Sequence, residues 1–177
     1  MTPGSQLHAR AQGIRLLVVD VDGVLTDGRL YYGANGEELK AFHIHDGLGL
    51  KLLRASGVEV AIVTGRTSRA VELRAENLGL PYVFQGISDK LAVFEQLLAR
   101  FALKATAVAA IGDDLPDLPV LRRCGFAACV PEASGPVRGA AHYVTDRPGG
   151  GGAVREVCDF LMTAQGTIEV AMREYVK

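Results

Sequence analysis

The chain contains no tryptophan, and aromatic residues make up only 6% of its 177 positions. It also lacks a charge excess, because 19 basic residues face 20 acidic ones and the formal net charge is −1. A nucleic-acid-binding protein usually carries a basic excess, and a disordered chain combines high net charge with low hydrophobicity. The balanced charge and the apolar content of 49% therefore argue against both classes and indicate a globular protein with a real core.

Cysteine is scarce, and long apolar runs are absent. The three cysteines, Cys124, Cys129 and Cys158, are odd in number and show no Cys-x-x-Cys spacing, which argues against a disulfide framework or a zinc site. No apolar run reaches the roughly 20 residues of a membrane-spanning helix, and residues 1–13 lack the apolar core of a signal peptide. We therefore expect a cytoplasmic protein that binds neither membranes nor nucleic acid, with residues 1–13 as a flexible tail.

Glycine, by contrast, is abundant, with 21 of the 177 residues against an average of about 7%. The length suits a single domain, which we expect over residues 14–177. Residues 29–44 alternate polar with apolar side chains around a central Gly-Ala-Asn-Gly, which predicts a projecting β-hairpin. Residues 149–152 are four consecutive glycines, so we expect residues 149–177 to form a flexible hinge followed by a helical tail.

Short apolar runs alternate with helical patterns along the rest of the chain. Unbroken apolar runs of this length are typical of strands buried on both faces. Strands that alternate with helices predict βαβ units with right-handed crossovers. The fold class is therefore α/β, a three-layer αβα sandwich with a mainly parallel sheet. The expected strands are 15–20, 58–63, 82–84, 106–111, 126–130 and 142–144, and the expected helices are 48–55, 68–78, 89–101, 116–124 and 153–175.

Polar side chains follow three of the expected strands at their carboxyl ends. In an open parallel sheet these ends share one edge, where ligands bind. A lone aspartate there is most simply a helix cap, but clustered aspartates repel one another and need a divalent cation. Carboxylate oxygens without thiols favour magnesium. The residues are Asp20 and Asp22, then Thr64, then Asp113, Asp114 and Asp117, with Lys90 at the start of an intervening helix.

Phosphoryl transfer is the chemistry that these residues fit. Asp20 is the expected nucleophile, forming an aspartyl-phosphate, and Asp22 is the expected acid and base for the leaving alkoxide and the attacking water. Magnesium held by Asp20, Asp113 and the backbone carbonyl of Asp22 would offset the repulsion between carboxylate and phosphate. Thr64 and Lys90 are expected to contact the phosphoryl oxygens.

Three neighbouring residues are expected to assist. Asp114 is predicted to orient a metal-bound water or Lys90. Asp117 is open between a similar role and structural capping. Gly23 is expected to let the backbone approach the phosphate closely.

The order of these motifs resembles that of the haloacid dehalogenase (HAD) phosphatases. DVDGVLT at 20–26, Thr64, Lys90 and GDD at 112–114 look like the four motifs of that superfamily, and the similarity runs from residue 15 to the end. The resemblance implies a Rossmann-like fold. An aspartate at position 22 implies phosphatase chemistry, because dehalogenase members lack an acid/base there.

The hairpin and the C-terminal segment resemble more narrowly the 3-deoxy-D-manno-octulosonate 8-phosphate (KDO 8-phosphate) phosphatases. The similar segments are 32–47, 63–66, 111–117 and 149–159. This resemblance implies a magnesium-dependent enzyme without a cap domain that hydrolyses KDO 8-phosphate to KDO and phosphate, in lipopolysaccharide precursor biosynthesis. It also implies a homotetramer in which the hairpin and tail of a neighbour close each site.

The resemblance extends to residues that contact the substrate. Many relatives have arginine where this chain has His45, and histidine reaches less far and is only partly charged near neutrality. Lys51 and Arg74 are also compatible with solvated helix positions, and Arg155 is open between a neighbouring site and the surface. The implied substrate contacts are Asp22, His43, Ile44, His45, Asp46, Gly47, Lys51, Arg66, Arg74 and Lys90.

Two other functions fit parts of the pattern. Hairpin-bearing relatives without a cap domain also act on nine-carbon acids such as N-acylneuraminate 9-phosphate. Receiver domains place an aspartate, an acidic pair, threonine and lysine at the ends of a parallel sheet, but their acidic pair lies on the first strand and the acceptor comes later. Here the expected acceptor, Asp20, comes first with Asp22 beside it, which favours turnover over signalling.

Overall fold

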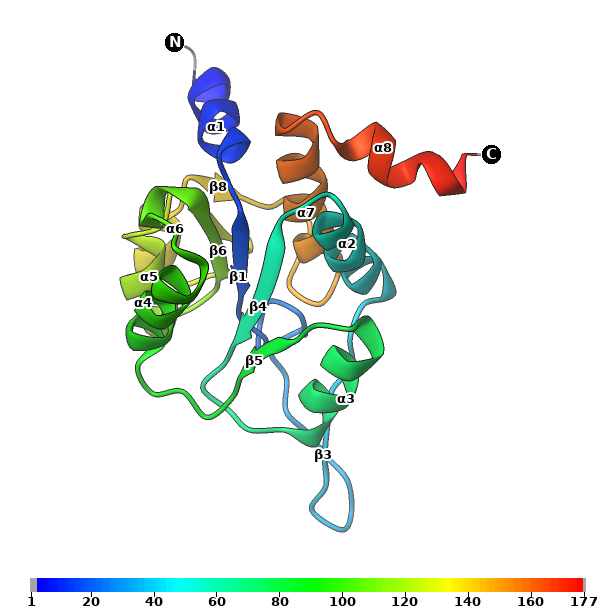
Figure 1. The fold of residues 1–177 in the computed structure, drawn as a ribbon. Helices are drawn as coiled ribbons and strands as arrows, with labels where there is room; N and C mark the ends of the chain where they lie inside the picture. The colour runs from blue at the N-terminus through cyan, green and yellow to red at the C-terminus, as the bar shows by residue number, and fades with distance from the viewer. Residues whose placement is uncertain (1–2, 177) are drawn as a thin grey trace.

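The structure, a computed structural model, describes residues 3–176 (Figure 1). Its main sheet has six strands in the order β5-β4-β1-β6-β7-β8, and every pairing in it is parallel. This confirms the predicted α/β class and the parallel sheet. The strands are β1 Leu16–Val19, β4 Glu59–Val63, β5 Tyr82–Phe84, β6 Val108–Gly112, β7 Phe126–Cys129 and β8 Tyr143–Val144.

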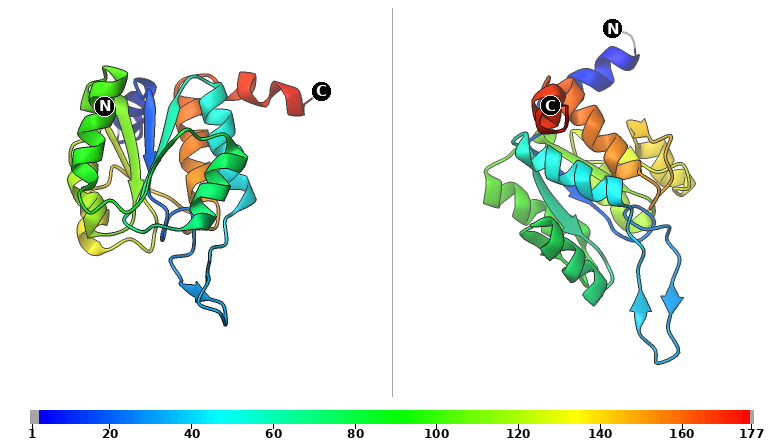
Figure 2. Two further views of the ribbon diagram at one scale, coloured as in Figure 1. Left: turned by 60° about the horizontal axis from the view of Figure 1, so that its bottom comes forward. Right: turned by 90° about the vertical axis from the view of Figure 1, so that its right-hand side faces the viewer.

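Helices cover both faces of the sheet and complete the three layers (Figures 1 and 2). Helices α4, α5 and α6 lie on one face, and α2, α3 and α7 lie on the other. The helices are α1 Pro3–Gln12, α2 Ile44–Ala55, α3 Arg69–Leu78, α4 Lys90–Phe101, α5 Leu118–Leu121, α6 Gly135–Ala140, α7 Ala153–Ala164 and α8 Ile168–Met172, with short 3₁₀ turns η1 Ala105–Ala107, η2 Leu115–Asp117 and η3 Arg173–Tyr175.

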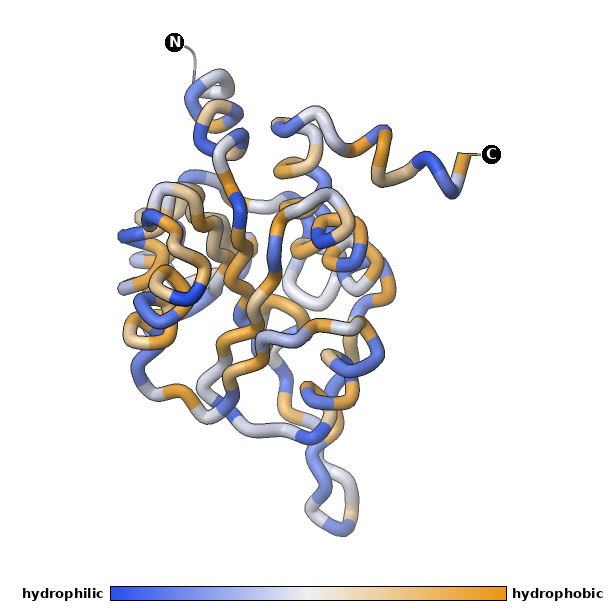
Figure 3. The backbone as a smooth tube through the Cα atoms, in the orientation of Figure 1, coloured by the Kyte–Doolittle hydropathy of each residue, from blue (hydrophilic) through white to orange (hydrophobic). Residues whose placement is uncertain are grey.

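The core lies between these layers and around the central strands. Every residue of β1, β6 and β7 is buried, which explains why those strands are apolar without alternation. Figure 3 shows apolar residues running through the central strands, while the helices alternate apolar with polar residues. No helix in the part of the chain that the structure describes is long and apolar enough to span a membrane.

A hairpin projects from the carboxyl edge of the sheet, as predicted (Figure 2). Its strands, β2 Tyr31–Tyr32 and β3 Glu38–Leu39, pair antiparallel, and Gly36 at the turn has a φ of +85°. The paired strands lie within residues 31–39, a shorter span than the predicted 29–44, and α2 begins at Ile44, four residues before the predicted start. His43 caps this helix, since its Nδ1 accepts the N–H of His45 at 3.2 Å.

The N-terminal residues differ from the loose tail that we predicted, because residues 3–12 form α1. Hydrogen bonds with residues far away in the sequence hold the end of this helix and the residues that follow it. Arg10 donates to the carbonyl of Gly125 at 3.1 Å, and Gln165 donates to the carbonyls of Ala11 and Ile14. Residues 1–2 and 177 lie outside the described residues.

Residues 149–152, hereafter the glycine segment, are not the flexible hinge that composition suggested. The N–H of Gly150 donates to the carbonyl of Val24 at 2.9 Å, and a Cβ on Gly149 would lie 1.9 Å from the carbonyl oxygen of Gly23. Backbone therefore packs directly on backbone, which only glycine permits. The helical tail after it is also interrupted, because the chain turns at Gly166 between α7 and α8.

Candidate active site

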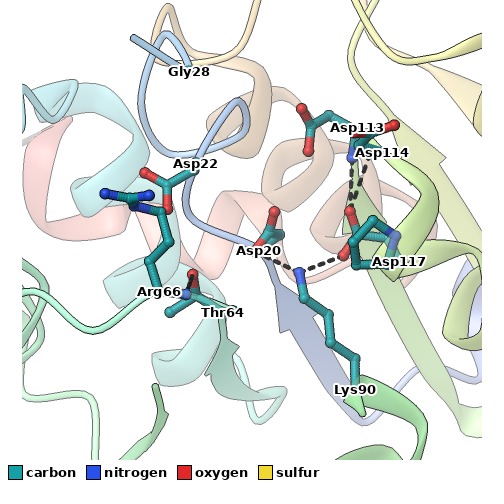
Figure 4. A pocket seen from close by; sticks show the side chains of 11 residues that line it. Asp20, Asp22, Gly28, Thr64, Arg66, Lys90, Asp113, Asp114 and Asp117 are labelled. Carbon is teal, nitrogen blue, oxygen red and sulfur yellow. Dashed lines mark hydrogen bonds and ion pairs between the residues drawn. The ribbon is translucent and has the colours of Figure 1, made fainter. Parts of the chain in front are cut away.

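The carboxyl ends of β1, β4 and β6 meet at one edge of the sheet, because β1 lies between the other two. This topology brings together the polar residues that follow those strands. They surround an open cavity of about 290 Å³ (Figure 4). Its lining consists of Asp20, Asp22, Gly28, Thr64, Gly65, Arg66, Lys90, Asp113, Asp114, Pro116 and Asp117.

A buried ion-pair cluster lies at the base of the cavity. The Nζ of Lys90 is 2.7 Å from Oδ1 of Asp20 and 2.7 Å from Oδ1 of Asp117. Lys90 is the first residue of α4, and Asp89 caps that helix by accepting the N–H groups of Leu91 and Ala92. The cap fixes the helix start and thereby points the lysine at the sheet edge.

Asp117, rather than Asp114, is the partner of Lys90. The second oxygen of Asp117 accepts the N–H groups of Asp113 at 3.1 Å and Asp114 at 3.3 Å. A Cβ on Gly112 would lie 2.4 Å from Cγ of Asp117, so glycine is required for this carboxylate to turn inward. Asp114 is exposed and caps η2, so it does not orient Lys90 directly, and its predicted role in orienting a metal-bound water stays a prediction.

Three of these carboxylates can share a cation. One carboxylate oxygen from each of Asp20, Asp113 and Asp117 lies within 4.8 Å of the other two. Both oxygens of Asp117 already accept hydrogen bonds, one from Lys90 and the other from two backbone N–H groups. An all-oxygen donor set with excess negative charge fits a hard divalent cation such as Mg²⁺. Asp20 and Asp113 could hold such a cation, while Asp117 is held by Lys90 and by two backbone N–H groups.

The electrostatics of the cluster show that it is short of positive charge. Burial, followed by the charge of Asp117, raises the pKa of Asp20 to about 7, although Lys90 acts in the opposite direction. Burial and the neighbouring charges of Asp117 and Asp114 raise the pKa of Asp113 to about 6. Burial alone would lower the pKa of Lys90, but the two adjacent carboxylates outweigh it and raise that pKa.

The loop after β1 (residues 20–28) is called the nucleophile loop below, after the predicted role of Asp20, and it is organised by Thr26. Its Oγ1 accepts the N–H groups of Gly23 and Gly28, each at 3.3 Å. Gly23 has a φ of +85°, and a Cβ there would lie 2.2 Å from Oδ2 of Asp113. Glycine is thus needed at position 23 because the loop passes directly over the acidic cluster.

Asp22 pairs with a residue that sequence reasoning missed. Its carboxylate forms an ion pair with Lys40, whose side chain is only 2% exposed, and Lys40 is also 3.1 Å from Glu38. Glu38 in turn contacts Arg66 at 2.5 Å. The available signal was the alternation of the hairpin, which places positions 38 and 40 on one face. Through this chain of contacts the base of the hairpin reaches the cavity.

Thr64 and Arg66 lie where the sequence placed them, at the end of β4. Thr64 is buried, its side chain faces the cavity, and its Oγ1 lies 3.5 Å from the N–H of Arg66. Arg66 is exposed and also lines the cavity.

The predicted substrate segment lies outside this cavity within the same chain. Residues 43–47 form the N-cap and first turn of α2. The guanidinium of Arg74 donates to the carbonyl of His43 at 3.4 Å, and Asp46 accepts the N–H of Arg155 at 2.7 Å. His43, Asp46, Gly47 and Arg74 line a small separate cavity, His45 lines a surface hollow with Arg147 and Arg155, and Ile44 and Lys51 are exposed.

Comparison with known proteins identifies the class of this fold and site. The model of the haloacid dehalogenase-like hydrolase family matches residues 43–125. KdsC of Escherichia coli (strain B / BL21-DE3), a KDO 8-phosphate phosphatase, is 49% identical over 94% of this chain and 89% of its own length. The chain therefore belongs to the haloacid dehalogenase-like hydrolases.

Within that class the chain belongs to the KDO 8-phosphate phosphatase family, and it is an enzyme. A probable YrbI family phosphatase from Pseudomonas syringae pv. phaseolica is 49% identical, with a TM-score of 0.95 and 98% of both chains covered. The Moraxella catarrhalis KDO 8-phosphate phosphatase, solved with magnesium, phosphate and KDO, is 40% identical with a TM-score of 0.94, covering 97% of this chain and 98% of that one. Family membership sets aside the receiver-domain alternative.

Proposed function

We propose that the protein hydrolyses KDO 8-phosphate to KDO and phosphate through an aspartyl-phosphate on Asp20, with Mg²⁺ as cofactor. The observation that carries this proposal is the buried cluster in which Asp20 meets Lys90 beside Asp113. The Moraxella relative, which binds magnesium, phosphate and KDO, supports the choice of ligand. With KDO 8-phosphate as its substrate, the enzyme would act in lipopolysaccharide precursor biosynthesis.

Five polar residues of the cavity have roles in this proposed reaction. A carboxylate oxygen of Asp20 attacks phosphorus while the bond from phosphorus to the sugar oxygen breaks, and Asp22 gives that oxygen a proton. Asp22 then takes a proton from water, which attacks the phosphorus and frees Asp20. Lys90 and Thr64 bind the phosphoryl oxygens as their charge grows. Asp20, Asp113 and the backbone carbonyl of Asp22 would hold Mg²⁺, which would neutralise part of the charge on the phosphate.

We further propose a homotetramer, in which the hairpin and tail of one subunit close the site of a neighbour. Two features of the single chain support it. The substrate residues expected at 43–47 do not reach the cavity of their own chain. The hairpin also exposes apolar side chains, with Tyr32 63% and Leu39 56% exposed. The three cysteines are unpaired and buried, which suits the proposed cytoplasmic location.

Phosphate release from purified enzyme tests the substrate and the cofactor together. We expect turnover of KDO 8-phosphate with Mg²⁺, loss of turnover in EDTA, and much slower release from N-acylneuraminate 9-phosphate. A preference for the nine-carbon acid would overturn the substrate assignment and leave the mechanism standing. Full activity in EDTA would overturn the metal assignment.

A further inference from the structure

The glycine segment is in direct contact with the nucleophile loop. The N–H of Gly150 donates to the carbonyl of Val24, and a Cβ on Gly150 would lie 2.5 Å from the backbone nitrogen of Asp27. Together with the contact of Gly149 against the Gly23 carbonyl, this places two successive glycines along the outer side of the loop. No side chain separates the two backbones there, so a shift of one must move the other.

The end of the glycine segment that leads into α7 is anchored from another helix. Gly152 is the N-cap of α7 and has no side chain that could accept the free N–H groups of the first turn. Asp46 of α2 caps α7 in its place, because its Oδ1 accepts the N–H of Arg155 at 2.7 Å. Asp46 is only 1% exposed, and the two helices approach closely enough that a Cβ on Gly49 would lie 3.1 Å from Cα of Arg155.

Residues 143–147, which precede the glycine segment, are anchored as well. Glu156 of α7 accepts the hydroxyl of Tyr143 at 2.6 Å and the N–H groups of Asp146 and Arg147, each at 2.9 Å. Thr145 donates to the carbonyl of Arg147 at 2.7 Å. The chain before the glycines is therefore held by the helix that follows them, and both ends of the segment depend on α7.

We propose that the glycine segment rigidly positions the nucleophile loop. We also propose that Asp46 is a positioning residue that holds the glycine segment in place by capping α7. The catalytic consequence rests on the proposed function; the structural coupling does not. Asp46 acts through the glycine segment, because its carboxylate is buried between α2 and α7 and does not line the catalytic cavity. A displacement of about 1 Å of a reacting group can lower a rate about 10²-fold.

The first experiment compares Gly149→Ala with Gly139→Ala. A Cβ at position 139, in α6, meets nothing within 4 Å, so this variant is the matched control. Hydrogen–deuterium exchange of the peptide that covers residues 20–28 reports on the loop without any substrate. We expect faster exchange there and a kcat lower by about 10²-fold in Gly149→Ala, with Gly139→Ala like the wild type.

The second experiment separates positioning from substrate contact with Asp46→Ala and Asp46→Asn. Asparagine keeps an oxygen that can accept the N–H of Arg155, whereas alanine does not. We expect Asp46→Ala to raise exchange in residues 20–28 and to lower kcat more than it raises KM, and Asp46→Asn to restore most of both. These variants also decide the matter if Gly149→Ala does not fold.

Unchanged exchange of residues 20–28 in folded Gly149→Ala or Asp46→Ala would overturn the proposal. So would an Asp46→Ala variant that changes KM alone, because that result assigns Asp46 to substrate binding. If the wild type fails to release phosphate from sugar-acid phosphates, only the proposed function is overturned. Hydrogen–deuterium exchange still measures the coupling between the glycine segment and the nucleophile loop.

Discussion

The sheet edge and the hairpin both reach the catalytic cavity, but they are held in different ways. At the sheet edge, Asp20, Lys90 and Asp117 are buried, and backbone N–H groups fix the carboxylate of Asp117. The hairpin is tied to the cavity by ion pairs of Lys40 and Arg66, and its tip is exposed. The first region is held by burial and by backbone hydrogen bonds, whereas charge contacts tie the second to the cavity.

The largest expected effect is at the proposed nucleophile, Asp20. Asp20→Asn keeps the shape of the side chain but removes the attacking oxygen anion, so phosphate release should fall by at least about 10³-fold. Circular dichroism should show an unchanged fold, because the variant also relieves repulsion with Asp117. Substantial remaining turnover would contradict the assignment of Asp20.

Asp117 should matter for stability as well as activity. Asp117→Ala leaves Lys90 with one partner and two backbone N–H groups without an acceptor, and breaking a buried pair in this way costs about 3–5 kcal/mol. Asp117→Asn keeps an acceptor and should lose less. Urea unfolding measures the difference, and equal stabilities for alanine and asparagine would show that the N–H contacts contribute little.

The acidic cluster should make the metal-free protein less stable as pH rises. The pKa of Asp20 is raised to about 7 and that of Asp113 to about 6, above the ordinary value of 3.8. Between the ordinary value of 3.8 and these raised values the folded state binds more protons than the unfolded state. The stability that these carboxyls contribute is therefore present at low pH and is lost as pH rises towards about 7. The Tm in EDTA should therefore fall over this range, and Mg²⁺ should restore it most at the upper end.

Asp113→Asn serves as the control for this pH effect. It removes one of the two titrating carboxyls, so the fall in Tm with pH should become shallower and Mg²⁺ should stabilise the protein less. An unchanged slope and an unchanged response to Mg²⁺ would place the titration and the metal elsewhere.

Lys40 tests whether the hairpin takes part in the site. Lys40→Met keeps the length of the side chain but leaves the carboxylates of Asp22 and Glu38 without their shared cation. We expect kcat to fall roughly tenfold, because Asp22, the proposed acid/base, would lose part of its positioning, while Lys40→Arg should recover much of the rate. A kcat equal to that of the wild type would limit the hairpin to a role outside the chemistry.

The fold and the order of the site residues could be read from the sequence because both depend on local patterns. Unbroken apolar runs fix the buried strands, and parallel topology then brings Asp20, Thr64 and Asp113 to one edge. The start of α2 was missed because histidine, the residue at its N-cap, is not among the preferred capping residues.

The remaining errors concern residues whose role depends on distant contacts. Local sequence does not show which aspartate of the run at 113–117 turns inward, and the outcome depends on Lys90 and on the space above Gly112. Four glycines in a row are equally compatible with a free hinge and with close backbone packing. Only the proximity of the nucleophile loop decides between the two at residues 149–152.

The smallest expected effect on folding lies at the tip of the hairpin. Tyr32 is 63% exposed and Tyr31 is 41% exposed, so Tyr32→Ala should change the free energy of unfolding of a single subunit by less than about 0.5 kcal/mol. The same change removes apolar surface that a neighbour would cover, and analytical ultracentrifugation should show a weaker tetramer. Gly139→Ala, far from the hairpin, provides the control. If Tyr32→Ala destabilises the subunit strongly but leaves assembly unchanged, the hairpin is part of the fold rather than of an interface, and the contrast with the sheet edge fails.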